Sequence, residues 1–584
     1  MKNKIETVKI EADVLIIGGG LAGCMAAIKA SESGLKVVIA EKANTLASGC
    51  AGSGIDHMWA HIPEVHNKMG YTADDMIDNH IKAVSHGFVN QDLLKIVVND
   101  SYERMLDLEK FGVKFRYEDS KLPGNFRVVS ELHSVPDSFN FDGRQIKVHL
   151  TKAAKRKGVK IYNRVSMTEL LSTSDGHISG ALGVGTRDGK LYYFRAKAVV
   201  MSTGRVNRLT RDQTGVWGNL RLPAYETGDG RAMAFRAGIP IINMEFLSPQ
   251  RFSIGNYELN LGSPRNTVQP AGAVVDGDNN TLIPRTQFYD WENLGKQPVD
   301  LAAAMEAQMQ TRFPNYHQLI QEGQGPFYLD LTGGTDEEIK YIEWSIINEG
   351  KGSLFLDYLK RQENFDFRKD KLEWLPNSRE MAGMASSGLV VDKNLETSIT
   401  GLFAAGDEVG GMPWSASPGA FTMGWRAGEN AAREAARHKK FFNANPDELD
   451  SLNSQMQRMN GNGHGHTWRE VETAVQNIVE YYANNVRSGS MLQRGLDRLG
   501  ELKGIVDLRS EAPHEAGRCL EVLSLIENAE MVMRGSKERK ESRRVPFGFY
   551  RADYPEQNDA EYFAFLSQQR NGNGIQVSKI QLRQ

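Results

Sequence analysis

A short apolar run that ends in a glycine-rich turn constrains this chain more than any other stretch. The run is Val14–Ile17, and three glycines follow it with the spacing G-x-G-x-x-G: Gly18, Gly20 and Gly23. The first glycine permits a tight turn, the second lets a pyrophosphate approach the backbone, and the third lets the next helix pack closely. A second apolar run, Lys36–Ala40, then ends at Glu41 and Lys42. We therefore predict a Rossmann-like α/β unit that binds a dinucleotide, with Glu41 accepting a ribose hydroxyl and Lys42 beside it.

Two later turns favour FAD over NAD as the dinucleotide. The apolar runs Ala198–Met201 and Gly401–Ala405 each end at a short polar or glycine-containing turn. The turn residues are Ser202, Thr203 and Gly204 after the first run, and Gly406 and Asp407 after the second. Each turn alone is typical of any strand that ends in a loop. Together, in this order, they predict a chain that returns twice to a flavin cofactor, with Asp407 facing its ribityl or pyrophosphate region.

The composition narrows the functional class. The 584 residues carry a formal net charge of −3, so no global field attracts nucleic acid or anionic lipid. No apolar run approaches the ~20 residues of a membrane span, and the N-terminus lacks the apolar core of a signal peptide, so we expect a cytoplasmic protein. The three cysteines form no C-x-x-C pair, and an iron–sulfur cluster normally takes four thiolates. We therefore expect no zinc finger and no iron–sulfur cluster bound by this chain alone.

Three further stretches carry a resemblance to a known family. They are T227-G-D-G-R-A-M-A-F-R-A-G-I-P with its M-E-F continuation, G401-L-F-A-A-G-D, and E541-S-R followed by Y550-R-A-D-Y-P. With the glycine-rich unit, they resemble flavoprotein subunits of the fumarate reductase, succinate dehydrogenase and adenylylsulfate reductase superfamily. The last stretch is most similar to adenylylsulfate reductase α subunits.

The resemblance spans nearly the whole chain and implies its domain organisation. The fold class is α/β, with a Rossmann-like FAD-binding domain that is split in sequence. Its two parts are residues 1–243 and 377–440. An α+β capping domain, residues 244–376, is inserted between them. A mainly helical C-terminal domain, residues 441–584, carries a tail that is expected to dock a partner.

The same resemblance adds further cofactor contacts. Ser48, Gly49 and Cys50 stand where succinate dehydrogenases have a Ser-His-Thr stretch whose histidine attaches FAD covalently, so noncovalent FAD is implied. The TGDGR stretch adds Asp229. Gly419 and Ala420 are expected to open a helix toward the flavin.

The stretch M244-E-F-L-S-P-Q-R-F lies where fumarate reductases carry a histidine that holds a substrate carboxylate. Ser-Pro-Gln takes that place, and a second family histidine is missing from residues 379–392. Two lost charge-assisted hydrogen bonds, each worth ~1.5–3 kcal/mol, argue against a plain dicarboxylate. Arg251 and Arg265 are the expected catalytic replacements because a guanidinium stays charged and matches an oxyanion. A salt bridge within the capping domain is the alternative for each. His61 is a third catalytic candidate, with a polar loop position as its alternative.

Three functions fit these features. We favour an FAD-dependent oxidoreductase that acts on a small anionic or polar substrate, and an iron–sulfur, ferredoxin-like subunit is its expected partner. Sulfur chemistry of the adenylylsulfate reductase type and an electron-transfer role within a larger redox complex are the alternatives. The charge run 537–544 is expected to be a solvated helix face, with a docking surface as the alternative. His464 and His466 are expected to lie in a glycine-rich turn rather than bind a metal.

Overall fold

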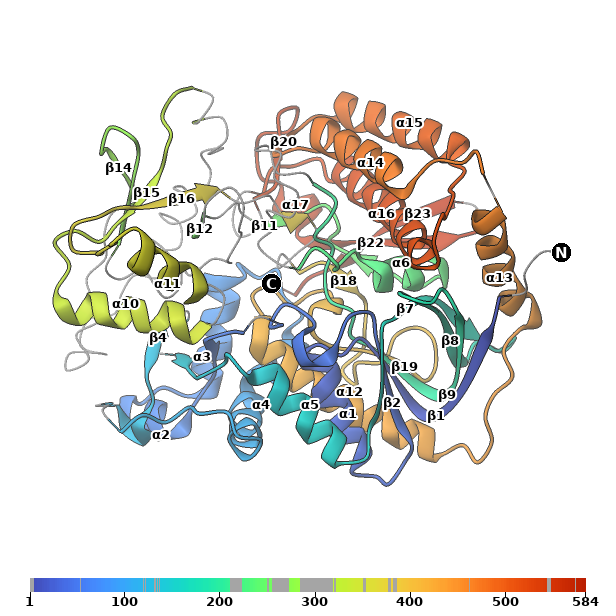
Figure 1. Ribbon diagram of the computed structural model, residues 1–584, viewed down its shortest axis with the longest axis horizontal. Coiled ribbons are helices and arrows are strands. Elements are labelled where there is room, and N and C mark those ends of the chain that lie inside the picture. The colour runs from blue at the N-terminus through green and yellow to red at the C-terminus, as the bar shows by residue number, and fades with distance from the viewer. Residues whose placement is uncertain are drawn as a thin grey trace.

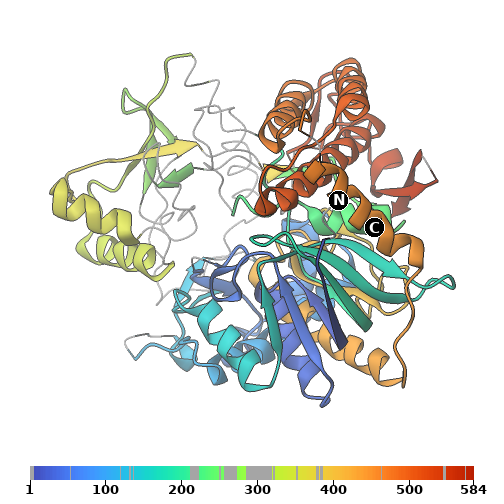
Figure 2. The ribbon, with the colours of Figure 1, turned by 45° about the vertical axis from the view of Figure 1, so that its right-hand side comes forward.

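The computed structural model describes residues 5–583 except 53, 119, 121, 131–132, 134, 136, 211–222, 249–251, 255–271, 284–318, 320–321, 350–352, 377–379, 382–385, 462, 544–547 and 573 (Figure 1). The described residues form a sheet covered by helices, a smaller sheet with its own helices, and a helical part. The helical part lies above the main sheet, and the smaller sheet stands to one side (Figure 2). The predicted α/β class is confirmed.

The main sheet holds the two apolar runs that flank the glycine-rich turn. Its seven strands are β1 (Thr7–Ile17), β2 (Val37–Glu41), β6 (Lys160–Asn163), β7 (Val165–Ser172), β8 (Ile178–Gly185), β9 (Leu191–Met201) and β19 (Leu402–Ala404). The order is β6-β2-β1-β9-β8-β7, and β19 joins β9. Strands β6, β2, β1, β9 and β19 are paired in parallel. Because Met201 is in register with Ile17 and with Ala404, the three predicted turns leave the same edge of the sheet.

Helices α1 (Leu21–Ser31) and α12 (Ala416–Ala436) cover this sheet and touch each other closely. Glycines of α12 make the contact possible. A Cβ on Gly424 would lie 2.4 Å from the carbonyl oxygen of Ala22, and a Cβ on Gly428 would lie 2.2 Å from that of Ala26. Strand β19 and helix α12, which come late in the chain, therefore pack in the same layers as β1 and α1. The exact domain limits stay predictions.

Further helices and a second small sheet come from the first 236 residues of the chain. The helices are α2 (Pro63–His66), α3 (Ala73–Asn79), α4 (Gln91–Lys110), α5 (Ile146–Arg156) and α6 (Asp229–Arg236). A separate three-stranded sheet joins β3 (His57–Trp59), β5 (Ser138–Asn140) and β4 (Val128–Ser130). This small sheet brings Trp59 next to residues 137–140.

The smaller part has its own sheet and its own core. The strand order is β12 (Phe252–Ile254), β16 (Leu372–Pro376), β15 (Tyr328–Asp330), β13 (Ala273–Val275) and β14 (Thr281–Ile283). Helices α10 (Asp336–Glu349) and α11 (Ser353–Gln362) accompany it. Phe327, Leu329 and Ile342 are buried in a cluster separate from the main core. Such a separate core is what an inserted α+β unit requires.

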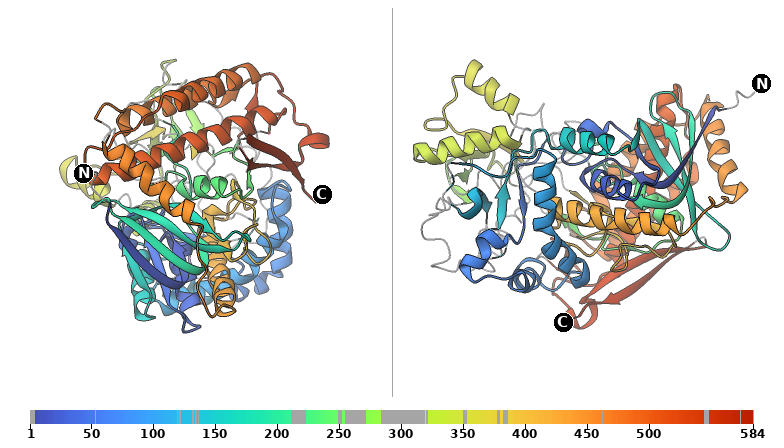
Figure 3. Two further views of the ribbon diagram at one scale, coloured as in Figure 1. Left: turned by 90° about the vertical axis from the view of Figure 1, so that its right-hand side faces the viewer. Right: turned by 90° about the horizontal axis from the view of Figure 1, so that it is seen from below.

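The C-terminal part is built from long helices followed by a hairpin. The helices are α13 (Pro446–Gly461), α14 (Trp468–Tyr482), α15 (Gly489–Ile505) and α16 (Pro513–Glu538). After the short helix α17 (Asp559–Tyr562), strands β22 (Ala564–Asn571) and β23 (Gly574–Gln581) form the hairpin (Figure 3). None of the described helices combines the length and apolar character needed to cross a membrane.

The C-terminal tail, residues 559–581, packs against other parts of the same chain. Strand β22 pairs with β10 (Ile241–Ile242), which also pairs with β18 (Gly388–Leu389). Tyr562 and Phe565 are buried there. These two aromatic side chains therefore pack in the interior of this chain. Docking of a partner by the tail stays a prediction.

Candidate functional site

The glycine-rich turn forms a backbone cradle at the start of α1. Gly18 has a φ of +94°, and a Cβ on it would lie 2.4 Å from the carbonyl oxygen of Ser202. A Cβ on Gly23 would lie 1.9 Å from the carbonyl oxygen of Gly18. Gly20 caps α1, no described side chain caps this helix, and its first turn has no acidic residue. Gly49 faces Gly20, since a Cβ on Gly49 would lie 3.1 Å from the Cα of Gly20. A bare helix N-terminus beside a cradle without side chains fits a pyrophosphate.

Polar side chains of the predicted set hold this cradle in shape. Glu41 is buried, and its carboxylate accepts hydrogen bonds from the backbone N–H groups of Gly19 and Ala43, both at 2.6 Å. The hydroxyl of Ser48 donates to the carbonyl oxygen of Gly19 at 3.1 Å. That of Ser202 donates to the carbonyl oxygen of Gly18 at 2.9 Å. These residues position the turn, and a direct bond from any of them to the cofactor stays a prediction.

Lys42 and Asp229 lie side by side. The Nζ of Lys42 is 2.6 Å from Asp229 Oδ2, 2.9 Å from the hydroxyl of Thr227 and 3.1 Å from Glu521 Oε1. Burial opposes the charge of Lys42, but Asp229 and Glu521 raise its pKa. Because Glu521 belongs to α16, this ion-pair cluster ties the nucleotide-binding unit to the C-terminal helices.

A cluster of buried charges follows the turn after β9. Arg205 Nε lies 2.7 Å from Asp407 Oδ2. The thiol of Cys50 donates to Glu226 Oε1 at 3.1 Å, and Asn207 donates to Glu226 Oε2 at 2.8 Å. Burial raises the pKa of Glu226 to about 7, although Arg205 and the Cys50 hydrogen bond oppose the shift. Burial and the Glu226 carboxyl raise the pKa of Cys50 well above its ordinary value, which keeps the thiol protonated. The predicted residues Cys50 and Asp407 therefore meet around Arg205 and Glu226, which no sequence motif had indicated.

A second arginine lies behind the same turn. Arg231 is fully buried and donates to the hydroxyl and carbonyl oxygens of Ser387, both at 3.0 Å, and to the carbonyl oxygen of Asp407 at 3.1 Å. Burial lowers the pKa of Arg231 to about 10, so it remains charged at neutral pH. Glu408 accepts a hydrogen bond from the backbone of Thr203 at 2.9 Å, and burial raises its pKa.

A small cavity of about 10 Å³, room for roughly one water molecule, lies where these groups meet the start of α12. Its lining residues are Ser386, Ser387, Asp407, Val409, Met412, Trp414, Ser415 and Ala416. Three of them are non-glycine residues in the left-handed region: Ser386 at φ +74°, Trp414 at φ +59° and Ala416 at φ +42°. Such backbone costs of order 1–3 kcal/mol per residue and concentrates at functional sites. Gly419 and Ala420 lie near the start of α12, which begins at Ala416, and their contact with the cofactor stays a prediction.

A pair of buried histidines supports one wall of this pocket. The indole N–H of Trp59 donates to the carbonyl oxygen of Trp414 at 2.9 Å, and the Trp59 ring lies against His133, with centroids 5.0 Å apart. His133 Nδ1 bonds Asp137, and His133 Nε2 lies 2.9 Å from His80 Nδ1. Burial and the neighbouring His133 hold the pKa of His80 well below its ordinary value. No sequence pattern indicated this pair, because the two histidines are 53 positions apart.

Of the three predicted catalytic residues, only His61 lies among the described residues. Arg251 and Arg265 lie outside the described residues. His61 is described, and its Nε2 lies 3.2 Å from the carbonyl oxygen of Tyr71 while its ring stacks on His66. It does not line the pocket described above. The catalytic role of all three residues stays a prediction.

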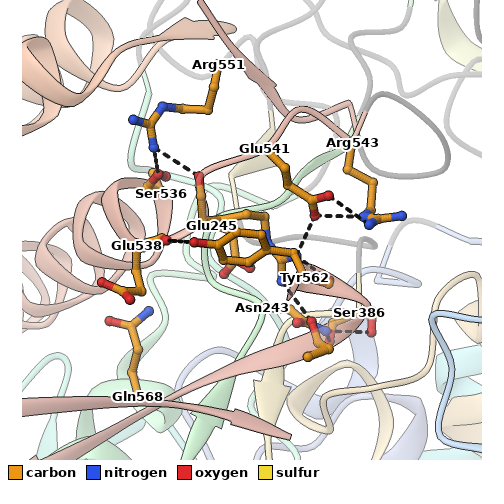
Figure 4. Close-up of polar contacts among 12 residues, drawn as sticks. Asn243, Glu245, Ser386, Ser536, Glu538, Glu541, Arg543, Arg551, Tyr562 and Gln568 are labelled. Carbon is orange, nitrogen blue, oxygen red and sulfur yellow. Dashed lines mark hydrogen bonds and ion pairs between the residues drawn. The ribbon is translucent and has the colours of Figure 1, made fainter. Parts of the chain in front are cut away.

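The Met-Glu-Phe stretch is anchored by a buried chain of ion pairs (Figure 4). Arg539 lies 2.8 Å from both Glu245 and Glu541, and Arg543 lies 2.8 Å from Glu541. All four side chains are 3% exposed or less. The expectation of a solvated helix face for residues 537–544 is therefore wrong for Arg539, Glu541 and Arg543. These three residues form ion pairs with one another, and Arg539 also pairs with Glu245, almost 300 positions earlier in the chain.

Comparison with known proteins agrees with this geometry. Residues 13–279 match the FAD binding domain family, and residues 472–583 match the fumarate reductase flavoprotein C-terminal family. The chain is 25% identical, over 94% of its length and 96% of the relative, to a fumarate reductase (CoM/CoB) subunit of Methanothermobacter marburgensis.

Solved structures show the same fold. Adenylylsulfate reductase from Archaeoglobus fulgidus superposes with a TM-score of 0.82 at 22% identity, covering 100% of this chain and 97% of that one. A quinol-fumarate reductase superposes with a TM-score of 0.77 at 19% identity, covering 99% of each chain. The chain therefore belongs to the FAD-dependent oxidoreductases that combine an FAD binding domain with the fumarate reductase flavoprotein C-terminal domain.

Proposed function

We propose that this chain is the flavin-bearing subunit of an oxidoreductase that acts on a small anionic substrate. FAD, when bound, exchanges electrons in pairs with a substrate and one at a time with a protein partner. The observation that carries the proposal is the position of Arg205 and Arg231. Both guanidinium groups contact Asp407, a lining residue of the pocket.

The balance of charge around this pocket favours an anion. Burial raises the pKa of both Glu226 and Glu408, which weakens the negative charge that these two carboxyls set against the guanidinium groups of Arg205 and Arg231. Preorganised positive charge in a water-poor site stabilises negative charge that develops on a substrate. Hydroxyl groups of Ser386, Ser387 and Ser415 line the same pocket and can orient oxygen atoms.

Arg251 and Arg265 remain the proposed direct anion contacts. Arg251 follows strand β11 (Leu247–Ser248), which pairs with β17 (Glu380–Met381), so the pairing brings the Met-Glu-Phe stretch beside residues 380–381. These are the two stretches from which the family histidines are missing. An arginine there would replace the lost charge-assisted hydrogen bonds.

An iron–sulfur protein is the proposed electron partner. The chain has three cysteines, of which Cys24 and Cys519 are buried and all three are free. A cluster with four thiolate ligands cannot form on this chain. The matched relative from Methanothermobacter is itself named as one subunit of an enzyme, which supports a multi-subunit assembly.

Sulfur chemistry of the adenylylsulfate reductase type is the second candidate. One observation favours it: the E541-S-R stretch, whose residues resemble that family, is buried in the ion-pair chain behind the Met-Glu-Phe stretch. Trp414 on the pocket wall departs from the family pattern and counts against adenylylsulfate itself.

The proposed function is tested by an anaerobic flavin reoxidation experiment. The FAD of the purified protein is reduced, and its reoxidation is followed by absorbance as fumarate, other enoates or adenylylsulfate is added. Fast reoxidation by an enoate supports carbon–carbon double-bond chemistry. A flavin adduct of sulfite that AMP discharges supports the sulfur candidate. Reoxidation only by an iron–sulfur protein overturns the proposal in favour of a purely electron-transferring role.

A further inference from the structure

Two histidines and a glutamate meet at the C-terminal end of α12, opposite to the end that lines the pocket. They are His177, which directly precedes β8, and Glu434 and His438, which lie one helical turn apart. One potential ligand atom from each lies within 4.8 Å of the other two. His438 Nε2 is 2.8 Å and His177 Nε2 is 3.5 Å from the same carboxylate oxygen, Glu434 Oε1. We propose that these three residues bind a divalent transition-metal ion such as Zn²⁺.

The tautomer of His177 supports a cation between the side chains. Its Nδ1 lies 2.7 Å from the carbonyl oxygen of Ile178, and a carbonyl can only accept. Nδ1 therefore carries the proton, and in the neutral ring Nε2 presents a lone pair. That lone pair faces the carboxylate oxygen of Glu434 at 3.5 Å. Two electron pairs face each other across this gap unless a metal ion or a second proton fills it.

The surroundings orient the three ligands as outer-shell groups do in metal sites. Arg437 lies 2.7 Å from the other oxygen of Glu434, Oε2, which leaves Oε1 for the histidines. The ring of Phe442 packs on His177 and His438, with centroids 4.0 Å and 4.8 Å away.

The ligand types select the metal class. Imidazole nitrogen and a single carboxylate suit Zn²⁺, Co²⁺ or Ni²⁺ rather than Ca²⁺ or Mg²⁺, which prefer oxygen ligands. Zinc bonds of ~2.1 Å in a tetrahedron place neighbouring ligand atoms about 3.4 Å apart. The His177–Glu434 separation of 3.5 Å already matches this spacing. The 2.8 Å contact of His438 would lengthen slightly on binding.

A metal here would fasten the end of α12 to the turn that precedes β8. Residues 437–445 connect α12 to α13, and His438 lies at their start. His177 forms an isolated parallel β-bridge with Thr400, which precedes β19. The site is therefore structural in position and independent of the proposed substrate.

The experiment uses the full-length, FAD-loaded protein after removal of bound metal with a chelator. Zn²⁺ is titrated by calorimetry, and Co²⁺ is added separately to record its visible absorption. We expect one Zn²⁺ per chain, a higher melting temperature with Zn²⁺, and strong Co²⁺ bands of a four-coordinate site. His438→Ala should weaken Zn²⁺ binding by more than about 100-fold, because loss of a ligand exceeds the effect of losing an outer-shell partner.

The matched control is His464→Ala, which removes an exposed histidine from the glycine-rich loop. This variant should bind Zn²⁺ like the wild type. The FAD content of each variant reports whether it has folded, and Glu434→Gln provides a second variant if His438→Ala has not. Absence of binding in the wild type would show that a proton alone fills the gap and would overturn the proposal. Binding that survives in both site variants, or is lost in His464→Ala, would also overturn it.

Discussion

The indole N–H of Trp59 donates a 2.9 Å hydrogen bond to the carbonyl oxygen of Trp414, which joins two residues 355 positions apart. Trp414 lines the candidate substrate pocket and has a φ of +59°. Trp59 in turn rests on the buried His80–His133 pair. The strained wall of the pocket is therefore held by a residue of the small sheet β3-β5-β4, which is separate from the main sheet.

Trp59→Phe tests whether this bond shapes the pocket. A buried carbonyl that loses its donor costs ~1–3 kcal/mol, so we expect the rate of flavin reoxidation by substrate to fall about tenfold or more, with FAD content unchanged. Stopped-flow absorbance measures the rate. The control is Trp425→Phe, because Trp425 lies on α12 against Arg104 and Lys29 and makes no contact with the pocket lining that we describe. Equal rates in both variants would show that the bond has no role in turnover.

Gly23→Ala tests the cradle. The added Cβ would lie 1.9 Å from the carbonyl oxygen of Gly18, so the turn must open or α1 must move. We expect retained FAD to fall at least about tenfold, which corresponds to ~1.4 kcal/mol of binding free energy. The flavin-to-protein absorbance ratio after gel filtration measures it.

Gly500→Ala is the matched glycine control. Gly500 lies in α15, and a Cβ there would meet no atom within 4 Å. This variant should retain FAD fully and gain up to about 1 kcal/mol of stability from helix propensity. Full FAD retention by Gly23→Ala would exclude the cradle as the pyrophosphate site.

Glu226→Gln tests the raised pKa of a buried carboxyl. Between about pH 4.5 and pH 7 the unfolded carboxyl ionises while the native one keeps its proton, so Glu226 lowers stability as pH rises through this window. The full difference is roughly 3 kcal/mol at ~1.4 kcal/mol per pH unit. Relative to wild type, the variant should therefore be more stable at pH 8 than at pH 5, as urea unfolding can measure. Glu501→Gln on α15, where the side chain is 54% exposed, should change stability by less than ~0.5 kcal/mol at either pH. A Glu226→Gln effect that does not depend on pH would contradict the assignment.

Arg539→Met tests the buried ion-pair chain. The change leaves Glu245 and Glu541 buried without their shared partner, which should cost ~3–5 kcal/mol of unfolding free energy. Arg534→Met is the control, because Arg534 pairs with Glu530 near the surface and this change should cost less than ~1 kcal/mol.

A double variant tests whether Glu245 and Arg539 are coupled. Glu245→Gln combined with Arg539→Met should lose less unfolding free energy than the sum of the two single variants. Strict additivity would show that the two residues are not coupled.

Short-range sequence patterns were sufficient to predict the nucleotide-binding turn and its flanking strands. The spacing of Gly18, Gly20 and Gly23 is fixed by steric requirements within a few residues, so the sequence alone predicted the turn. The apolar runs before Ser202 and Gly406 were equally local. The parallel pairing of β9 with β1 and of β19 with β9 could not be predicted, because it joins strands that are far apart in the chain.

Long-range partners could not be predicted. Residues 537–544 looked solvated because a charge run usually is, but Arg539 meets Glu245 from a distant segment. Glu434 and His438 carry a visible i, i+4 spacing, yet nothing in the sequence pointed to the third member, His177. Arg205 follows the predicted turn at Gly204 and Glu226 precedes Thr227, but both become functional candidates only through their buried contacts with Asp407 and Cys50.

The most direct test of the proposed function compares an anionic acceptor with its neutral ester under anaerobic conditions. Reduced, FAD-loaded protein is mixed in a stopped-flow instrument with the anion identified in the acceptor series, and separately with the ester of the same compound. We predict fast, saturable reoxidation by the anion and little or none by the ester, because Arg205 and Arg231 provide the positive charge beside the pocket. Equal rates for the two compounds, or no reoxidation by any small anion, would contradict the proposed function.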